Sequence, residues 1–304
     1  MQTHLQISGR VFSSDDILWL TKTLSGQKEI SRESLARSFC QYAGWYKPDG
    51  GLKTMSCKVA LLRLDKLGLL HLPAPRKKNN YSRKPSRTPL AESQPEIRIE
   101  ASGLELHFEL VNPKTSSFWN ELIDRYHYLG YSPLAGAQLR YFVRAKEQIV
   151  ALLGFCAAAW KVAARDAFIG WNPEKRQQHL HQLVNNSRFL ILPWIKSKNL
   201  ASRILSKAAR ILPHDWKVRY QYEPLLLETF VEKERFSGTC YRAANWQCVG
   251  DTTGRGKWDR LHQNYKPVKS IWLYPLDGRY KKRLCDLGSG SVGIYEAIFP
   301  TRPL

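Results

Sequence analysis

The sequence lacks a long apolar segment. Its longest apolar run, residues 149–160, is shorter than the roughly 18 residues that a membrane-spanning helix needs. The first residues, MQTHLQISGR, have no apolar core of the kind found in a signal peptide. We therefore expect a cytoplasmic protein without a membrane partner. Its 304 residues are enough for about two domains.

Closely paired cysteines are also absent. The 6 cysteines include no C-x-x-C pair, and several lie within apolar segments. This pattern favours reduced, mostly buried thiols over disulfide bonds or a zinc site. The two histidines of the HLH segment at 179–181 have no cysteine pair beside them, so we expect no metal site.

Acidic residues are few relative to basic ones. Asp and Glu number 26 against 47 Lys and Arg, which gives a formal net charge of +21. A surplus of this size is typical of proteins that bind polyanions, because phosphates neutralised by the protein release their condensed counterions. The sequence therefore predicts DNA as a partner, with solubility alone as the alternative explanation of the charge.

Residues 1–72 are predicted to form a small DNA-binding domain of the winged-helix or helix-turn-helix type. A capping-box pattern from Ser13 to Asp16 and a second serine at Ser31 mark the starts of two helices. A third helical pattern at 52–68 precedes an apolar segment at 69–73, which we interpret as a strand. The third helix would carry basic groups into the major groove, and a small protein-interaction domain is the alternative. The predicted DNA contacts here are Lys53, Lys58 and Arg63.

Residues 73–95 are rich in proline and basic residues and hold almost no large apolar side chain. This composition predicts an extended linker, either a solvated spacer or a segment that contacts phosphates through Arg76, Lys77 and Lys78. Residues 281–304 contain a Gly-Ser-Gly segment and are interpreted as a C-terminal tail, either a linker or an artificial segment, to which we assign no function.

Residues 96–280 are predicted to form an α/β domain with a mixed sheet. Strand patterns at 96–111 and a hairpin at 137–160 predict antiparallel pairs. Two short apolar strands, 188–195 and 224–231, are separated by a helix and are therefore expected to lie parallel. The stretch 238–256 is predicted to be a helix that ends at a Gly-Arg-Gly turn facing DNA or a cofactor, and a last strand is expected at 269–276.

The turn KSKNLA at 196–201 resembles the acyl-CoA-binding turn of GCN5-related N-acetyltransferases. Lys196 and Ala201 fit that pattern, and Asn199 replaces its first glycine. The segment YRAANWQCVG resembles the last motif of the same superfamily, where a tyrosine at the position of Tyr241 protonates the leaving thiolate. The resemblance implies an acetyltransferase-like core, and it leaves the cofactor itself open. The cofactor contacts that it implies are Lys196, Lys198, Asn199 and Ala201.

Longer blocks resemble a second family. RYHYLGYSPLAGAQLRYFV, NNSRFLILPWIKSKNLASRIL and LLETFVEKERFSGTCYRAANWQCVGDTTGRG are similar to the DruA family of Druantia anti-phage systems. Relatives of that family also occur beside insertion-sequence transposases. The resemblance covers nearly the whole chain and implies a defence or mobile-element role on DNA, with other defence proteins or a transposase as partners.

Four side chains are candidate catalytic groups. His127 is an acid or base near neutral pH, or a core histidine. Glu228, in an apolar strand, is a functional base or the partner of a buried arginine, and Tyr241 shares its cleft or packs in the core. Asp166 forms a structural ion pair with Arg165, or a metal-dependent nuclease site with Glu228. Further candidate phosphate contacts are Arg140, Arg188 and Arg255.

These patterns together predict a DNA-binding, DruA-like protein with a winged-helix domain, a basic linker and an acetyltransferase-like α/β core. Whether it is an enzyme stays open. The alternatives are an enzyme that modifies a nucleic-acid base through that cleft, a metal-dependent nuclease or transposase, and a non-catalytic module that recruits a helicase or transposase.

Overall fold

The computed structural model describes residues 5–27, 29–48, 50–75, 84–100, 104–254 and 267–285. The chain forms two compact units that divide near residue 83. Within the described residues, no helix has the length and apolar character needed to cross a membrane.

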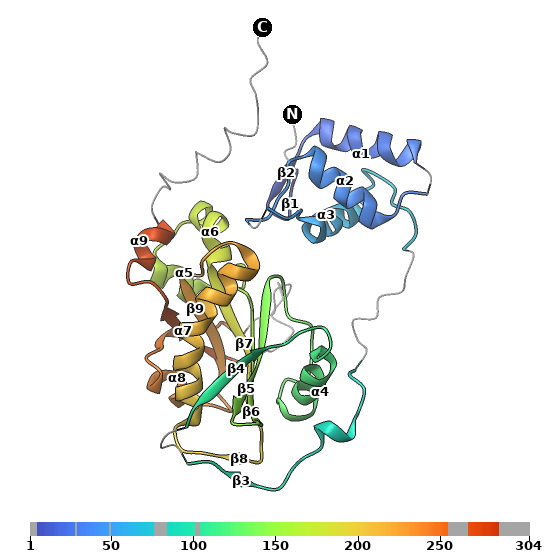
Figure 1. Ribbon diagram of the computed structural model, residues 1–304. Coiled ribbons are helices and arrows are strands. Elements are labelled where there is room, and N and C mark those ends of the chain that lie inside the picture. The colour runs from blue at the N-terminus through green and yellow to red at the C-terminus, as the bar shows by residue number, and fades with distance from the viewer. Residues whose placement is uncertain are drawn as a thin grey trace. The chain divides into compact units, whose positions relative to one another are not determined.

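The first unit contains a hairpin followed by three helices (Figure 1). Its elements are β1 (Leu5–Ile7), β2 (Arg10–Phe12), α1 (Ser14–Gly26), α2 (Arg32–Tyr42) and α3 (Thr54–Lys66). Ser13 and Ser31 accept hydrogen bonds from the first turns of α1 and α2, and Ser13 forms the predicted capping box with Asp16. The three predicted helices are confirmed.

The strand predicted at 69–73 is not formed. The described residues after α3 contain no strand up to residue 75, and the hairpin precedes the helices instead. Leu70 is buried and Leu72 packs against the core of the unit, which accounts for the apolar pattern without a strand. The order of elements thus differs from the expected one, and the winged-helix interpretation stays a prediction.

The exposed side of α3 is mixed rather than uniformly basic. Lys58 pairs with Glu33 of α2 at 2.5 Å, and Arg63 is exposed. Large apolar side chains share this surface: Met55, Val59 and Leu62. Such a helix offers apolar as well as ionic contacts to a partner.

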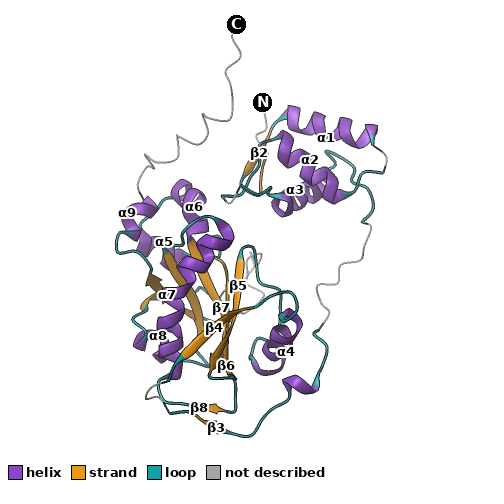
Figure 2. Ribbon diagram, in the orientation of Figure 1, coloured by secondary structure: helices purple, strands orange, loops and turns teal. Residues whose placement is uncertain are grey.

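The second unit is built on a seven-stranded mixed sheet in the order β10-β11-β9-β7-β6-β5-β4 (Figure 2). The strands are β4 (Leu106–Leu110), β5 (Gln138–Ala145), β6 (Gln148–Ala157), β7 (Leu183–Ile191), β9 (Leu226–Glu232), β10 (Gln247–Asp251) and β11 (Lys269–Pro275). Neighbours pair antiparallel except β7 and β9, which are parallel. The predicted mixed sheet, its hairpin and its parallel step are confirmed. A separate parallel pair joins β3 (Ile97–Arg98) to β8 (Ile195–Lys196).

Helices cover both faces of this sheet (Figure 1). They are η1 (Pro89–Ala91), α4 (Ser116–Tyr126), α5 (Ala163–Ile169), α6 (Pro173–His179), η2 (Leu180–Gln182), α7 (Leu200–Tyr220), α8 (Thr239–Ala243) and α9 (Tyr280–Cys285). On β5, Phe142 stacks on Phe118 of α4, while Tyr141 donates a hydrogen bond to Asp215 of α7. Because successive side chains of a strand point to opposite faces, α4 and α7 lie on opposite sides.

The stretch predicted as one helix divides into a helix and a strand. Helix α8 ends at Ala243, Asn245 takes a left-handed conformation with φ of 63°, and β10 begins at Gln247. Asparagine adopts this conformation more readily than most residues, so Asn245 is suited to end the helix. Trp246 is buried and its ring contacts Tyr241. Arg255 and Gly256 of the predicted Gly-Arg-Gly turn lie outside the described residues.

Part of the predicted linker is held against α4. The backbone and side chain of Thr88 donate to the buried carboxylate of Glu121 at 2.6 and 2.7 Å, and Arg125 donates to the same group. Burial opposes ionisation of Glu121, but these hydrogen bonds lower its pKa. Ala91 is fully buried. Arg76, Lys77 and Lys78 lie outside the described residues.

The remaining sequence expectations concern the cysteines and the tail. None of the six cysteines, all of which are among the described residues, forms a disulfide bond, and Cys40, Cys57 and Cys156 are buried. Within the part of the chain that the structure describes, no three His, Cys, Asp or Glu side chains are grouped to hold a metal ion. Residues 281–285 of the predicted tail belong to α9, whose Leu284 is buried, and the rest of the tail lies outside the described residues.

Candidate functional site

Strands β7 and β9 separate soon after they meet. They pair over three positions, the last of which joins Asn185 to Glu228, and no further pairing between them follows in the described residues. At the same place Ser187 has no partner on β6, since Asn186 and Arg188 pair with successive residues of that strand. A bulge of this kind adds a residue and bends the strand. Strand β7 therefore turns away from β9.

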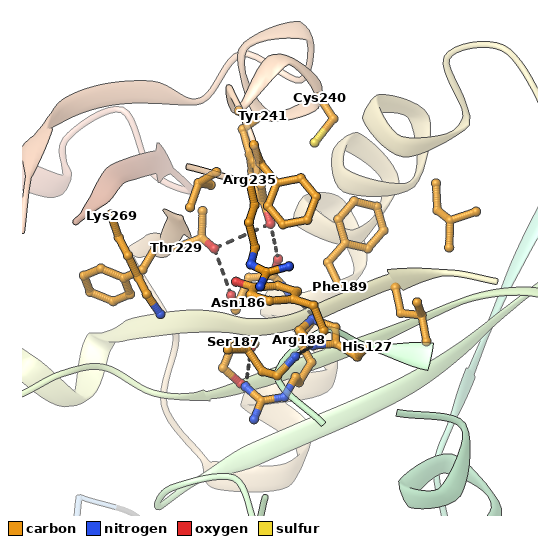
Figure 3. Close-up of a pocket in the computed structure, with 18 of the residues that line it drawn as sticks. His127, Asn186, Ser187, Arg188, Phe189, Thr229, Arg235, Cys240, Tyr241 and Lys269 are labelled. Carbon is orange, nitrogen blue, oxygen red and sulfur yellow. Dashed lines mark hydrogen bonds between the residues drawn. The ribbon is translucent and has the colours of Figure 1, made fainter. Parts of the chain in front are cut away.

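A cavity of about 720 Å³ occupies the space beside the separated strands (Figure 3). It is lined by β7, β9, residues 126–129 at the end of α4, residues 235–241, and Lys269. Gly238 is required in this wall, because its φ is 73° and a Cβ atom there would lie 2.5 Å from the Trp272 ring.

The inner wall carries three linked polar side chains, which we call the buried cluster: Asn186, Thr229 and Tyr241. The Tyr241 hydroxyl donates to Asn186 Oδ1 at 3.0 Å, and the Thr229 hydroxyl donates to the Asn186 carbonyl at 2.9 Å (Figure 3). Burial raises the pKa of Tyr241, so its phenol stays protonated at neutral pH. The cluster is a fixed, uncharged set of hydrogen-bonding groups.

The entrance carries two exposed aromatic rings, which with Arg235 we call the entrance cluster. Tyr128 is 40% exposed and Phe236 is 50% exposed, and their rings meet edge to face at 5.3 Å. The Arg235 guanidinium lies 5.4 Å from the centre of the Tyr128 ring and pairs with Glu232 at 2.8 Å. Large apolar rings are thus held in solvent beside a cation.

The charged side chains that line the cavity are cationic. They are Arg188, Arg235 and Lys269, and no aspartate or glutamate among the described residues lines it. Arg188 donates to the Ser187 carbonyl and to Ser132 Oγ, both at 2.8 Å. Glu232 offsets the charge of Arg235, so Arg188 and Lys269 are the cations that favour an anionic ligand over a cationic one.

His127 lines the same cavity. Its pKa is lowered to about 4 by burial and by the positive charge of Arg188, so the ring is neutral at pH 7. Its Nδ1 accepts a hydrogen bond from the Leu129 backbone at 3.2 Å. The proton of the neutral ring is therefore assigned to Nε2, which makes His127 a hydrogen-bond donor rather than a base.

Glu228 and Asp166 lie in a different environment. Both bind the fully buried Arg165: Glu228 Oε2 accepts at 2.8 Å and Asp166 Oδ1 at 2.7 Å. The other oxygen of Glu228 accepts from the Ala159 backbone at 3.0 Å, and Arg176 also pairs with Asp166. Burial raises the pKa of Glu228, and Arg165 counteracts this rise.

The structure does not bring Glu228 and Tyr241 into one cleft. Tyr241 contacts Thr229, the residue that follows Glu228, and neighbouring residues of a strand point to opposite faces. Glu228 is the partner of a buried arginine, one of the two interpretations of the sequence. The ion pair of Asp166 with Arg165 is also present.

The other predicted contacts lie away from the cavity. Arg140 donates to Asn120 and Ser116 of α4, and burial lowers its pKa. Lys196 and Lys198 line a separate shallow hollow, and Asn199, with φ of 59°, leads into α7. Ala201 lies in the first turn of α7. None of these residues lines the cavity with Tyr241.

Sequence reasoning missed the groups that surround Tyr241 and the entrance. The missed residues are Tyr128, Asn185, Asn186, Thr229, Arg235, Phe236 and Lys269. One signal was present: the polar segment Asn185–Ser187 directly precedes an apolar strand. Asparagine is depleted in strands, so this segment marks an irregularity such as the bulge.

The lowered pKa of His127 predicts acid sensitivity. As the pH falls from about 6.5 to about 4, the unfolded chain binds a proton that the folded chain does not. We expect this residue's contribution to be complete above pH ~6.5 and to fall by about 3 kcal/mol by pH ~4. The free energy of unfolding, measured with denaturant across this range, should depend less steeply on pH in His127→Gln than in the unaltered protein. Equal dependences for both proteins would contradict this assignment.

The Arg165–Glu228 pair predicts a large loss of stability on Glu228→Gln. The amide removes one of the two carboxylates bound to Arg165. Asp166 then has to neutralise both Arg165 and Arg176, so a net positive charge stays buried, which costs about 3 kcal/mol or more. The control is Glu109→Gln, which breaks a half-exposed pair with Arg144 and should cost about 1 kcal/mol or less. Thermal and denaturant unfolding compare the two variants. A loss for Glu228→Gln no larger than for the control would contradict the structural role.

The chain is similar to several solved acetyltransferase structures. A spermidine N-acetyltransferase chimera from Vibrio cholerae shares 12% identity at a TM-score of 0.38, over 58% of this chain and 97% of that one. An acetyltransferase of the GNAT family from Streptococcus pneumoniae shares 10% identity at a TM-score of 0.37, over 57% of this chain and 100% of that one. An aminoglycoside acetyltransferase in complex with coenzyme A shares 11% identity at a TM-score of 0.39, over 59% of this chain and 98% of that one. Similarity at this level carries no conclusion about cofactor or substrate.

The family comparison covers most of the sequence. No curated protein matches the chain. The profile of the Druantia protein DruA matches residues 63–292, which include the whole described sheet and the cavity. The chain therefore belongs to the DruA family.

Proposed function

We propose that this protein binds DNA in Druantia anti-phage defence and that the cavity between β7 and β9 contacts the nucleic acid. Membership of the DruA family implies the defence role. The observation that carries the proposal is the charge of the cavity, which three cationic side chains line in a chain of net charge +21. A surplus of positive charge of this size most commonly binds phosphate groups.

The proposed contacts extend beyond the cavity. In the first unit they include Lys53, Lys58 and Arg63, and the basic residues 76–78 and Arg255 belong to the same proposal. Contacts of this kind position a protein on nucleic acid without reading its sequence. In this view Arg188, Arg235 and Lys269 provide the local contacts of the core, and the basic residues elsewhere provide most of the affinity.

We propose that any chemistry in the cavity uses neutral donors. Tyr241 is held protonated, and His127 is neutral with its proton on Nε2. Two such donors suit the stabilisation of a developing negative charge or the protonation of a leaving group. A cofactor at Lys196, Lys198, Asn199 and Ala201 remains part of the proposal as a separate site, because these residues lie outside the cavity lining.

The alternative is a binding module without catalysis. It is supported by the engagement of both candidate carboxylates with Arg165, which leaves the cavity without an acidic side chain in the described residues. A general base for proton abstraction would then have to come from elsewhere. A module of this kind would hold DNA for a partner protein of the same defence system.

Binding of duplex DNA should weaken steeply with salt. The logarithm of the affinity is expected to fall with the logarithm of the salt concentration by about 0.9 per phosphate contacted. Lys269→Gln removes one proposed contact and should reduce the slope by about one. The control is Lys217→Gln on α7, where the lysine pairs with Glu223 at 2.6 Å. Fluorescence anisotropy over a salt series measures the slope for both variants and for the unaltered protein. An affinity for duplex DNA that is absent or independent of salt would contradict DNA binding.

A further inference from the structure

We propose that the cavity between β7 and β9 receives one unpaired base of a nucleic-acid strand. The base would stack against Tyr128 or Phe236, and its edge would bond to Asn185 and Arg188. This inference rests on the proposed function and narrows its ligand from nucleic acid in general to a single extruded or unpaired nucleotide.

The first support is the size of the cavity. Its volume of about 720 Å³ lies within the range of roughly 300–1,000 Å³ that is usual for small-molecule sites. A single nucleotide fits such a space, whereas a double helix does not enter it. Proteins that act on a base within a duplex solve the same problem by turning the nucleotide out of the stack into a pocket.

The second support is the entrance cluster. Tyr128 and Phe236 are large rings that remain about half exposed at the cavity mouth, and Arg235 lies over one of them. Exposed apolar rings cost free energy in water unless a ligand covers them. Bases stack on such rings whatever their sequence, and arginine adds contact with phosphate or with the ring face of a base.

The third support is a pair of unsatisfied polar atoms. Asn185 Oδ1 and Arg188 Nε are buried and have no hydrogen-bond partner among the described residues, and both residues line the cavity. Buried polar atoms are nearly always paired, so these two point to a ligand that supplies a donor and an acceptor. The edges of the bases present donors and acceptors side by side.

The cationic lining of the cavity favours a base with its flanking phosphates over other small ligands. A polyamine or another cationic acceptor would meet Arg188, Arg235 and Lys269 with no lining carboxylate in the described residues. A nucleotide cofactor would need a site for its phosphates, and the turn at 196–201 lies outside the cavity lining. A base with its flanking phosphates satisfies the rings, the unpaired atoms and the cations together.

The test compares two duplexes of equal length, one fully paired and one with a single-nucleotide bulge. We expect the full-length protein to bind the bulged duplex about tenfold more tightly, since one base gains a stacking partner. Phe236→Ala and Tyr128→Ala should each reduce the affinity for the bulged duplex more than the affinity for the paired duplex, and so lower this preference. Trp160→Ala is the matched control, because Trp160 is 48% exposed and does not line the cavity.

Asn185→Leu tests the hydrogen-bonding part of the inference. The change keeps the size of the side chain and removes an acceptor that has no partner in the described residues, so the melting temperature should not fall. With A, C, G or T placed in the bulge, the order of preference among the four bases should change. A lower melting temperature with an unaltered order would overturn the role of Asn185.

The remaining outcomes separate the inference from the proposed function. Equal affinity for both duplexes would overturn the inference that the cavity receives an unpaired base, and would leave the proposal of DNA binding intact. No binding of either duplex overturns the proposed function itself. Binding of coenzyme A that Phe236→Ala weakens, without preference for the bulge, assigns the cavity to a cofactor and also overturns the inference.

Discussion

The separation of β7 from β9 is the constraint on which the rest of the second unit depends. A parallel pair that continued to the ends of both strands would satisfy its backbone groups and leave no space between them. Here the bulge at Ser187 bends β7 just beyond the last paired position, Asn185 with Glu228. Helix α8 and the segment before it then close the space from one side, so the cavity follows from one inserted residue in one strand.

Two consecutive residues of β9 stabilise this fork on opposite faces of the sheet. Glu228 anchors one face through Arg165, which also donates to the Ala159 carbonyl beyond the end of β6 at 2.7 Å. Thr229 anchors the other face through the carbonyl of Asn186, and so fixes the buried cluster. A buried ion pair adds little net stability by itself, but loss of one member leaves an uncompensated charge. The ion pair on one face therefore helps to preserve the fork between β7 and β9 at which the cavity opens.

Local patterns predicted the elements better than their arrangement. The helices of the first unit followed from caps such as Ser13 and Ser31, and the mixed sheet followed from apolar runs and their lengths. The prediction of a strand at 69–73 was wrong, because Leu70 and Leu72 pack in the core of the first unit without forming a strand. The role of Glu228 stayed open in the sequence because its partner, Arg165, lies 63 positions away. The entrance cluster had no signal, since an exposed aromatic residue is visible only when the fold is known.

The most direct test of the central claim is a photo-cross-link from one base. A duplex would carry a single bulged 5-iodouracil, and peptides joined to it after irradiation would be identified by mass spectrometry. We expect cross-links to peptides that contain Tyr128 or Phe236, the exposed rings at the cavity entrance. Cross-links confined to residues 1–83 would show that DNA binds elsewhere and that the cavity between β7 and β9 serves another ligand.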